Sequence, residues 1–571
     1  MYSEDGRTMA GRVEMAIVGA AAGLAMWALV DKGRDIVTNP HAYLATVSFA
    51  AGFFAILLGL SGPHRVARAA LPALLLGGIG ALLITLSGLR FGTLDEIGQA
   101  GHPIAGWALF LCIATPFAAV RLVQHESLTD YGRLFDTSWS ILVRYSAGWL
   151  FSGIFFGVAF LSHALLDIVG ITIIEDLLEH EPVLWAFVGF SLGLGLSVVH
   201  ELRQYLSPYL LLRMLRMLVP VVLVVVAVFA AAALFQGPDQ LFGSLSRAAT
   251  LLAVALVMIS LITIALDRSD ADAFEPRWMQ LSTAALAMLL PVIAALATYA
   301  IWLRVAQYGW TPTRLLSAAV AFVIVLHAVA YLVCVVMGAG WMARVRRANV
   351  WIAGATLVSI AAWMSPVLNA ERISTSNQMA RAESGAVRPD QAPLWEMQHE
   401  WGKAGRDGLE ALKVSENVAL AKAAEEVSKG RRPGREDQRA EMVQQLLEVL
   451  VVLPAGEQIT ADQIGNMSSW ELAEFEDCGE DPENRCVLVF GDFGATVEGR
   501  QAILLQSEPG RSSWRRWMVT FDSNSVDFQR LASRYSLTKA HIQRLVDGDY
   551  RVAPSSLNSL WIGDFEILPT E

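Results

Sequence analysis

Residues 217–236 read MLVPVVLVVVAVFAAAALFQ, a run that contains no charged side chain. An α-helix rises about 1.5 Å per residue, so roughly 20 apolar residues are enough to cross the hydrocarbon core of a bilayer. The run therefore predicts a transmembrane helix, and it sets the pattern by which the rest of the chain is read.

Ten more stretches of this kind lie in the first two thirds of the chain. All candidate spans together are 13–30, 43–60, 70–88, 103–120, 145–165, 183–199, 217–236, 248–266, 281–303, 315–337 and 350–368. The composition agrees, because 54% of the residues are hydrophobic and only 17% are charged, against about 25% charged residues in a soluble protein. We therefore expect an all-α polytopic transmembrane helix bundle of about 11 helices over residues 1–369.

The first apolar run has an alternative interpretation as a cleaved signal peptide. Arg7 and Arg12 precede it, as basic residues precede the apolar part of a signal peptide. Glu14 and the length of the run favour an uncleaved helix.

The remainder of the chain is polar and acidic. Residues 370–571 carry 22 basic and 33 acidic residues, so the whole formal charge of −11 lies there. Such a segment is poorly suited to bind nucleic acid or an anionic lipid surface. We predict a polar linker over residues 370–392 and a small soluble α+β domain over residues 393–571.

The loops between the spans differ in their content of Lys and Arg, which sets the orientation of a membrane protein. With the N-terminus inside, fifteen Lys or Arg residues fall at the inside ends of the spans and six at the outside ends. The loop of residues 167–182 has five acidic residues and no Lys or Arg, which also suits the outside. An odd number of spans then places the C-terminal domain outside, which is the periplasm if the chain resides in a bacterial inner membrane.

The four cysteines fit this topology. Cys112 and Cys334 lie within apolar spans, where packing is their simplest role. Cys478 and Cys486 lie close together in the C-terminal domain, and an oxidising compartment would let them pair across a short loop. Two unrelated thiols are the alternative to this disulfide.

Ionisable groups are scarce inside the spans. His327 is the one such group well inside a span, where it can act as a proton relay or a ligand, or simply bond a neighbouring helix. His327 and Tyr299 mark a candidate intramembrane polar site, which a transporter would extend with residues such as Ser317.

Pairs of small residues four positions apart predict close approaches between helix backbones. These pairs include Gly19 and Gly23, Gly153 and Gly157, and Gly189 and Gly193.

The sharpest local motif is RVAQYGWTPTR at residues 304–314, between the ninth and tenth spans. Thr311 can cap a helix that starts at Pro312. Tyr308 and Trp310 are the kinds of aromatic residue that anchor a chain at the membrane interface.

Two arginines bracket this turn, and two interpretations of them stay open. Arg304 and Arg314 could hold a phosphate or a carboxylate, which gives a candidate anion or interface site made of Arg304, Tyr308, Trp310 and Arg314. The alternative is a well-capped reversal with aromatic anchors and no ligand.

The same motif carries a resemblance to a known family. QYGWTP at residues 307–312, with Arg304 and Arg314 beside it, resembles the bacterial membrane family called domain of unknown function 4153. PYLLLR at residues 208–213 and NQMAR at residues 377–381 are similar to other recurrent parts of that family. The resemblance covers spans five to eleven best. It implies the polytopic topology and, because the family has no assigned activity, it implies no mechanism.

The C-terminal domain is expected to combine helices with short strands. Helices are predicted over 394–428, 436–452, 527–535 and 538–546, and strands over 486–490, 502–505, 517–521 and 560–568. Residues 531–546 resemble a helix-turn-helix, but the acidic composition and the outside location argue against DNA binding. Five acidic residues beside Cys478 do not follow an EF-hand spacing, so a solvated loop is preferred over a calcium site. They are Glu476, Asp477, Glu480, Asp481 and Glu483.

No nucleophile elbow, phosphate-binding loop, zinc-protease motif or dinucleotide fingerprint occurs in the sequence. We therefore predict no catalytic residue, cofactor or metal site. We expect a non-catalytic component of the bacterial inner membrane, embedded in the lipid bilayer, whose periplasmic domain binds a protein partner. A transporter or exporter of a small molecule is the alternative, and it requires a polar cavity in the bundle.

Overall fold

The computed structural model describes residues 4–567 except for several short segments. These are residues 62–65, 202–207, 237–244, 271–275, 433–434, 466, 468–470, 473–474, 476–477, 480–485, 494–498, 508–513, 523–525, 532–536, 554–559 and 563–564. The chain divides into two compact units, Met1–Gly430 and Arg431–Glu571. The division falls later than the boundary expected from the sequence, because the helices between residues 370 and 428 belong to the first unit.

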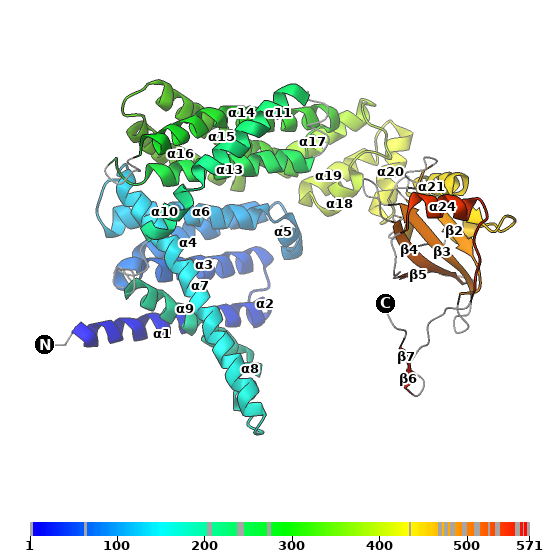
Figure 1. The fold of residues 1–571 in the computed structure, drawn as a ribbon. Helices are drawn as coiled ribbons and strands as arrows, with labels where there is room; N and C mark the ends of the chain where they lie inside the picture. The colour runs from blue at the N-terminus through cyan, green and yellow to red at the C-terminus, as the bar shows by residue number, and fades with distance from the viewer. Residues whose placement is uncertain are drawn as a thin grey trace. The chain divides into compact units, whose positions relative to one another are not determined.

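The first unit is built mainly from long apolar helices (Figure 1). Ten of the described helices are long and apolar enough to cross a membrane, and the bent pair Trp341–Met364 and Pro366–Glu383 provides an eleventh candidate. The spans are α1 (Glu4–Asp31), α3 (Pro40–Leu60), α4 (Val66–Gly88), α6 (His102–Ala118), α7 (Tyr131–Asp167), α9 (Glu181–Glu201), α11 (Val219–Gln236), α13 (Leu245–Leu266), α14 (Arg277–Tyr308), α15 (Pro312–Val336) and α16 (Trp341–Met364). The prediction of a bundle of about eleven helices is thereby confirmed, and the chain is a multi-pass membrane protein.

Short helical elements connect these spans. They are α2 (Gly33–Ile36), α5 (Leu94–Ala100), α8 (Ile173–Glu179), α10 (Pro208–Arg216) and a π-helix, η1 (Ala119–Val123), that continues α6. Asn39 caps α3 and Thr93 caps α5 by accepting backbone N–H bonds, so the polar loop residues define where these helices start.

Glycines allow α1 and α9 to cross in close contact. A Cβ atom on Gly19 would collide with the carbonyl oxygen of Gly189, and one on Gly189 would collide with that of Gly19. The small-residue pairs on these two helices therefore face each other across one crossing, as helices in membranes commonly pack. Gly153 and Gly157, on α7, have open space around them instead.

The two largest apolar clusters among the described residues of the spans stabilise the bundle. One joins α3, α4 and α6 with the end of α16, and the other joins α11, α13, α14 and α15. The outer surface is apolar as well, as at Leu150 (67% exposed), Val225 (62%) and Trp302 (59%). An apolar exterior suits contact with lipid tails rather than with water.

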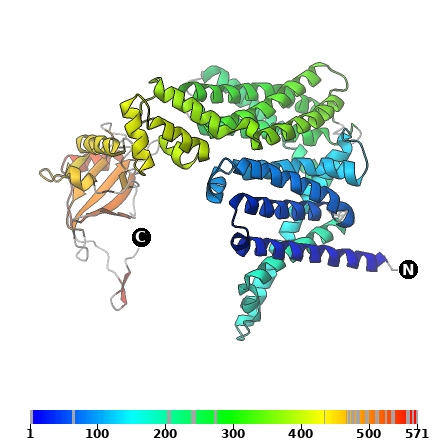
Figure 2. The same ribbon diagram turned by 180° about the vertical axis from the view of Figure 1, so that it is seen from behind.

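A helical cap follows the last span. The chain bends by 66° after Met364 and continues into α17 (Ala370–Glu383), α18 (Leu394–His399), α19 (Gly402–Leu412) and α20 (Val418–Ser428). We call residues 370–428 the cap; Figure 2 shows it from behind, beside the green spans. Because α17 carries four charged side chains in its 14 residues, we place the end of the last span at Met364.

The cap differs in two ways from the sequence-based expectation. Residues 370–383, expected to be part of a linker, form α17, and the helical stretch expected over 394–428 is divided into three helices. The first break precedes Gly402, whose φ of +57° disfavours other residues and whose Cβ position lies against the carbonyl of Arg90.

The second unit contains a five-stranded sheet of order β1-β2-β3-β4-β5 (Figure 1). The strands are β1 (Val451–Leu453), β2 (Cys486–Phe490), β3 (Arg500–Ser507), β4 (Trp514–Phe521) and β5 (Val526–Arg530). β1 and β2 are parallel, and the other neighbours are antiparallel. A separate hairpin pairs β6 (Leu560–Ile562) with β7 (Phe565–Ile567).

Helices cover both faces of this sheet. α21 (Arg435–Val449) and α22 (Ala461–Gly465) contribute to the core on one face. α24 (Lys539–Val546) contributes Ile542 to the core on the other face. The small C-terminal sheet expected from the sequence is confirmed.

One predicted element of this unit was wrong. Residues 527–535 were expected to be helical, but β5 occupies Val526–Arg530. Val526 and Phe528 are buried while Asp527 and Gln529 are exposed, which is the period of two of a strand with one covered face. Within the stretch that resembles a helix-turn-helix, residues 532–536 lie outside the described residues, and residues 539–546 form α24.

Candidate functional site

The reversal between α14 and α15 is short and well capped. It occupies Gly309–Thr311, since α14 ends at Tyr308 and α15 begins at Pro312. Gly309 has a φ of +73°, a conformation that side chains other than glycine disfavour. The Thr311 side chain accepts the backbone N–H at the third position of α15 (3.4 Å), which is the cap that the sequence predicted.

Helix α17 of the cap contacts this reversal. Gln378 Nε2 donates hydrogen bonds to the carbonyl oxygens of Tyr308 (2.8 Å) and Trp310 (3.0 Å). Asn377 Oδ1 accepts the backbone N–H of Trp310 (2.8 Å). Neutral amide side chains of α17 therefore satisfy the polar backbone of the turn.

The contact leaves no room for a larger residue at the turn. Arg381 Nη2 donates to the carbonyl oxygen of Gln307 (2.7 Å). A Cβ atom on Gly309 would lie 2.6–2.7 Å from atoms of Asn377, Gln378 and Arg381. The two sequence segments singled out at residues 304–314 and 377–381 thus form one site.

Three arginines gather around this turn. The Arg304 and Arg314 guanidinium carbons lie 5.4 and 5.5 Å from the centroid of the Tyr308 ring, within the range of a cation–π contact. Arg314 Nη1 also donates to the carbonyl oxygen of Gly309 (2.8 Å). Arg304 and Arg381 are both close enough to Arg314 to repel its charge. The structure brings together the four residues of the predicted site and adds Arg381.

A second polar cluster is buried where the cap meets the spans. Glu371 Oε2 lies 3.3 Å from Arg90 Nη1, and Glu371 Oε1 lies 2.8 Å from His102 Nε2. The indole N–H of Trp363 donates to His102 Nδ1 (3.2 Å). Because an indole can only donate, His102 accepts at Nδ1 and donates at Nε2, which is a neutral tautomer.

Arg90 also satisfies the bend that follows α16. Its Nη2 donates to the carbonyl oxygens of Trp363 (2.5 Å), Ser365 (2.6 Å) and Leu368 (3.2 Å). Carbonyls at the end of a helix have no partner within the helix. Arg90 therefore stabilises the 66° bend from which the cap emerges.

Glu371 is held ionised by these neighbours. Burial by itself opposes ionisation, but the hydrogen bond from His102 and the charge of Arg90 outweigh burial and lower the pKa of the carboxyl. The carboxylate, only 1% exposed, is thus a fixed negative charge between two partners on the spans.

The loop after α4 contacts α19 of the cap. The backbone N–H of Lys403 donates to the carbonyl oxygen of Arg90 (2.8 Å), and Lys403 Nζ donates to that of Leu89 (3.0 Å). Arg406 pairs with Glu96 of α5 (3.1 Å). Both α17 and α19 of the cap are therefore attached to the same end of the bundle.

The two residues of the candidate intramembrane site have different surroundings. His327 Nδ1 lies 2.9 Å from the carbonyl oxygen of Val323, four residues earlier on its own helix. Tyr299 is 41% exposed and stacks on Trp302, itself an exposed residue. Tyr299 thus faces the lipid-contacting exterior.

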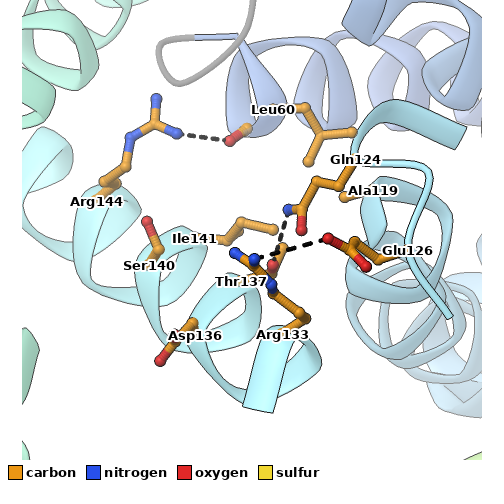
Figure 3. A pocket seen from close by; sticks show the side chains of 11 residues that line it. Leu60, Ala119, Gln124, Glu126, Arg133, Asp136, Thr137, Ser140, Ile141 and Arg144 are labelled. Atoms are coloured by element: carbon orange, nitrogen blue, oxygen red, sulfur yellow. Dashed lines mark hydrogen bonds and ion pairs between the residues drawn. The ribbon is translucent and has the colours of Figure 1, made fainter. Parts of the chain in front are cut away.

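A cavity of about 460 Å³ lies at the end of the spans opposite to the cap, between the end of α3, η1 and the start of α7 (Figure 3). Arg144 Nη1 donates to the carbonyl oxygen of Gly59 on its wall (2.9 Å). Arg133 and Glu126 form an ion pair at its rim (3.6 Å). Neither His327 nor Tyr299 lines this cavity.

The second unit contains a disulfide that joins Cys478 to Cys486, the pair proposed from the sequence. Cys486 begins β2 and is fully buried. Among the residues that the structure describes, no group of three His, Cys, Asp or Glu side chains could hold a metal ion. The acidic residues considered for calcium, at 476–477, 480–481 and 483, lie outside the described residues.

No sequence motif singles out Arg90, His102 or Glu371. Arg90 was one loop arginine among many, and Glu371 fell in the expected linker. Their pairing spans 281 positions of the chain, and no local pattern predicts it. Arg381 had a signal, since it ends the NQMAR segment, but that segment pointed to a family and not to the turn.

The comparisons with known proteins give one family. A family model described as "Domain of unknown function (DUF4153)" matches residues 44–394. This range covers the spans from α3 onward and ends within the first part of the cap. No curated protein and no solved structure matches the chain.

Proposed function

This chain belongs to the family described as Domain of unknown function (DUF4153), and we propose that it is a non-catalytic component of the bacterial inner membrane. In this proposal the spans and the cap anchor the second unit on the periplasmic side, where that unit binds a protein partner. The observation that carries the proposal is the buried Arg90–Glu371–His102 cluster, because it fixes the base of the chain's outward extension to the spans.

The arrangement of charges supports the orientation. In this proposal the bent pair after α15 supplies the eleventh span, so the cap lies at the end of the bundle opposite to the start of α1. Fifteen Lys or Arg residues fall on the side of the N-terminus and six on the side of the cap, and the basic side of a membrane protein is usually cytoplasmic. The disulfide of the second unit agrees, since disulfides persist in oxidising compartments.

The polar contacts of the cap support a structural role. Arg90, Gln378 and Arg406 donate hydrogen bonds to backbone carbonyls or to a carboxylate of the same chain. Such contacts fix geometry and leave these side chains engaged. The chain leaves the cap at Ser428 and enters the second unit at Arg431, so the cap is the segment that connects the spans to that unit along the chain.

The edge of the sheet in the second unit supports partner binding. β5 is hydrogen-bonded to β4 on one side, and no other described strand pairs with its second edge. An open strand edge is the element to which an extended peptide can add by backbone hydrogen bonds. We therefore place the partner contact on the second unit.

The orientation is testable with a reporter enzyme that is active only after export, fused after Ser428. A matched fusion in the loop at Gln124, on the N-terminal side of the bundle, is the control. We expect activity from the Ser428 fusion and none from the Gln124 fusion. The reverse pattern would overturn the proposal.

Partner binding is testable by deletion of residues 431–571. Crosslinking in intact cells should yield a defined adduct with the full chain, and the shortened chain should insert normally and lose that adduct. An unchanged adduct pattern from the shortened chain would show that the second unit binds no partner.

Transport of a small molecule is the second candidate, and the cavity at the N-terminal side of the bundle favours it. Ser140 and Thr137 lie on its α7 wall (Figure 3). Replacing Ser140 by Trp should fill the cavity and stop uptake or export of a labelled solute pool. The exposed Leu150→Trp change, further along α7, is the matched control.

A further inference from the structure

One face of α7 forms a polar wall of the cavity at the N-terminal side of the bundle (Figure 3). Its polar members are Arg133, Asp136, Thr137, Ser140 and Arg144. Residues three and four positions apart are neighbours on a helix surface, so these side chains form one stripe. Residues 145–166 of the same helix contain no Lys, Arg, Asp or Glu, so the charged part of α7 is the part beside the cavity.

The charges of the lining are balanced and engaged. Arg133 pairs with Glu126 (3.6 Å), and Asp136 pairs with Arg268 from the loop after α13 (3.4 Å). Arg144 donates to a backbone carbonyl at the end of α3 (2.9 Å). Two basic and two acidic side chains line the cavity, so it favours a ligand of neither sign.

Three uncharged side chains keep hydrogen-bonding capacity beside the cavity. Gln124 Nε2 donates to Thr137 Oγ1 (3.1 Å), so the amide oxygen of Gln124 is left as an acceptor and the hydroxyl of Thr137 as a donor. Ser140 makes no side-chain hydrogen bond with another described residue, so its hydroxyl can both donate and accept. A ligand that donates and accepts over a short distance would satisfy all three groups.

The rest of the lining argues against two other classes of ligand. Among the described residues that line the cavity there is no aromatic side chain, and stacking on such a side chain is how a flat aromatic ring is commonly held. Leu60 and Ile141 are the two large apolar side chains of the described lining, which is little surface for a lipid chain. The volume of about 460 Å³ is typical of a site for a small molecule.

The backbone beside Gln124 is unusual as well. η1 continues α6 as a π-helix, in which the backbone N–H of Gln124 donates to the carbonyl oxygen of Ala119, five positions earlier (3.0 Å). Such helices are rare and occur frequently at functional sites. Here η1 places both Ala119 and Gln124 on the wall of the cavity.

We propose that this cavity binds a small, uncharged, hydroxyl-rich solute of the polyol or monosaccharide class. A hydroxyl group donates and accepts at one atom, so neighbouring hydroxyls of such a solute match Gln124, Thr137 and Ser140. This site goes beyond the anchoring role proposed above, and binding does not require that the solute be transported.

Direct binding to the purified full chain tests the proposal, in a detergent without a sugar headgroup. Equilibrium dialysis with radiolabelled glucose and sorbitol measures the binding. Glucosamine and gluconate are the matched charged probes, because they add a positive or a negative group to the same carbon skeletons.

Two variants of one residue address the site. Ser140→Ala removes a hydroxyl, and Ser140→Trp fills the cavity. Ser138→Ala is the control, because Ser138 Oγ donates to the carbonyl oxygen of Leu134 within the helix (2.7 Å) and Ser138 does not line the cavity.

We expect saturable binding of at least one neutral probe to the wild type and to Ser138→Ala. Ser140→Ala should weaken this binding by about threefold to tenfold, the range that one hydrogen bond contributes, and should keep the wild-type thermal midpoint without a probe. Ser140→Trp should abolish the binding.

Three results would overturn the proposal. The first is no saturable binding of either neutral probe to the wild type. The second is equal binding by the wild type and Ser140→Trp. The third is tighter binding of glucosamine or gluconate than of the matching neutral probe, since the site would then select for charge.

Discussion

Glu371 Oε2 lies 3.3 Å from Arg90 Nη1, although 281 positions of the chain separate the two residues. Both side chains are buried, with 1% and 5% of their surface exposed. Buried ions are stable only when they are paired and hydrogen-bonded, and here His102 completes the set. The pair therefore connects the first turn of α17 to the loop after α4.

Removing Glu371 should release the cap. Glu371→Ala leaves Arg90 buried without its counter-charge, and breaking a buried pair in this way costs about 3–5 kcal/mol. We expect a lower thermal midpoint and faster protease cleavage between α17 and α18. Glu383→Ala, at an exposed position of the same helix, is the control and should change neither quantity. A Glu371→Ala protein as stable as the control would contradict the role given to the pair.

Acid should loosen the same contact. The pKa of Glu371 is lowered from its ordinary value of 4.5 by its hydrogen bond and by Arg90, against the effect of burial. A carboxyl with a lowered pKa in the folded state stabilises that state above its unfolded pKa, and the stabilisation is lost as the pH falls through the folded value. Protease sensitivity of the cap should therefore rise below about pH 4.5. Glu371→Gln should remove most of this pH dependence; an identical profile in wild type and Glu371→Gln would exclude this carboxyl as its source.

Hydropathy was enough to predict the spans, because crossing a bilayer imposes a minimum apolar length on each helix. Residues 217–236 illustrate this, since α11 covers Val219–Gln236. Hydropathy did not predict the cap, because the cap is stabilised by contacts with residues that are far away in the sequence. α17 is polar, and its attachment depends on Arg90 and on the turn at Gly309, which no pattern within residues 370–383 records.

The candidate site was predictable in part for a similar reason. Arg304, Tyr308 and Arg314 lie within one turn of sequence, so their proximity follows from the chain itself. Arg381 joins them only through the packing of α17. For β5 the local pattern was misleading. Asp527 to Tyr535 has the spacing of apolar residues that is typical of a helix, but the residues that pair with β4 alternate between buried and exposed, as in a strand.

The turn at Gly309 should tolerate no side chain. Gly309→Ala adds backbone strain of about 1–3 kcal/mol, because φ +73° with ψ −177° is a conformation that essentially only glycine adopts, together with a collision against Asn377, Gln378 and Arg381. Gly338→Ala isolates the strain, because Gly338 has a φ of +75° and nothing within 4 Å of its Cβ position. We expect the thermal midpoint to fall clearly further in Gly309→Ala than in Gly338→Ala. Equal losses would show that α17 does not press on the turn.

The crossing of α1 and α9 should be equally sensitive to one methyl group. Gly19→Ala places a Cβ atom against the carbonyl oxygen of Gly189, and overpacking of this kind typically costs about 1–3 kcal/mol. Gly157→Ala, on α7, meets open space and should be neutral or slightly stabilising, since alanine favours a helix by up to about 1 kcal/mol over glycine. Thermal midpoints in detergent measure both effects, and a neutral Gly19→Ala would contradict the close crossing.

The disulfide gives a last prediction that bears on both stability and location. Cys478→Ser should destabilise the second unit by about 2–4 kcal/mol, because the crosslink restricts the unfolded chain, and faster hydrogen exchange in β2 measures this loss. Cys112→Ser, which removes a thiol within a span, is the control and should leave that exchange unchanged. Dithiothreitol should mimic Cys478→Ser in the wild type and add nothing to the variant.

In intact cells the wild-type pair should resist maleimide until a reductant is added. Immediate labelling of both thiols would place the second unit in a reducing compartment and contradict the orientation on which its proposed role rests.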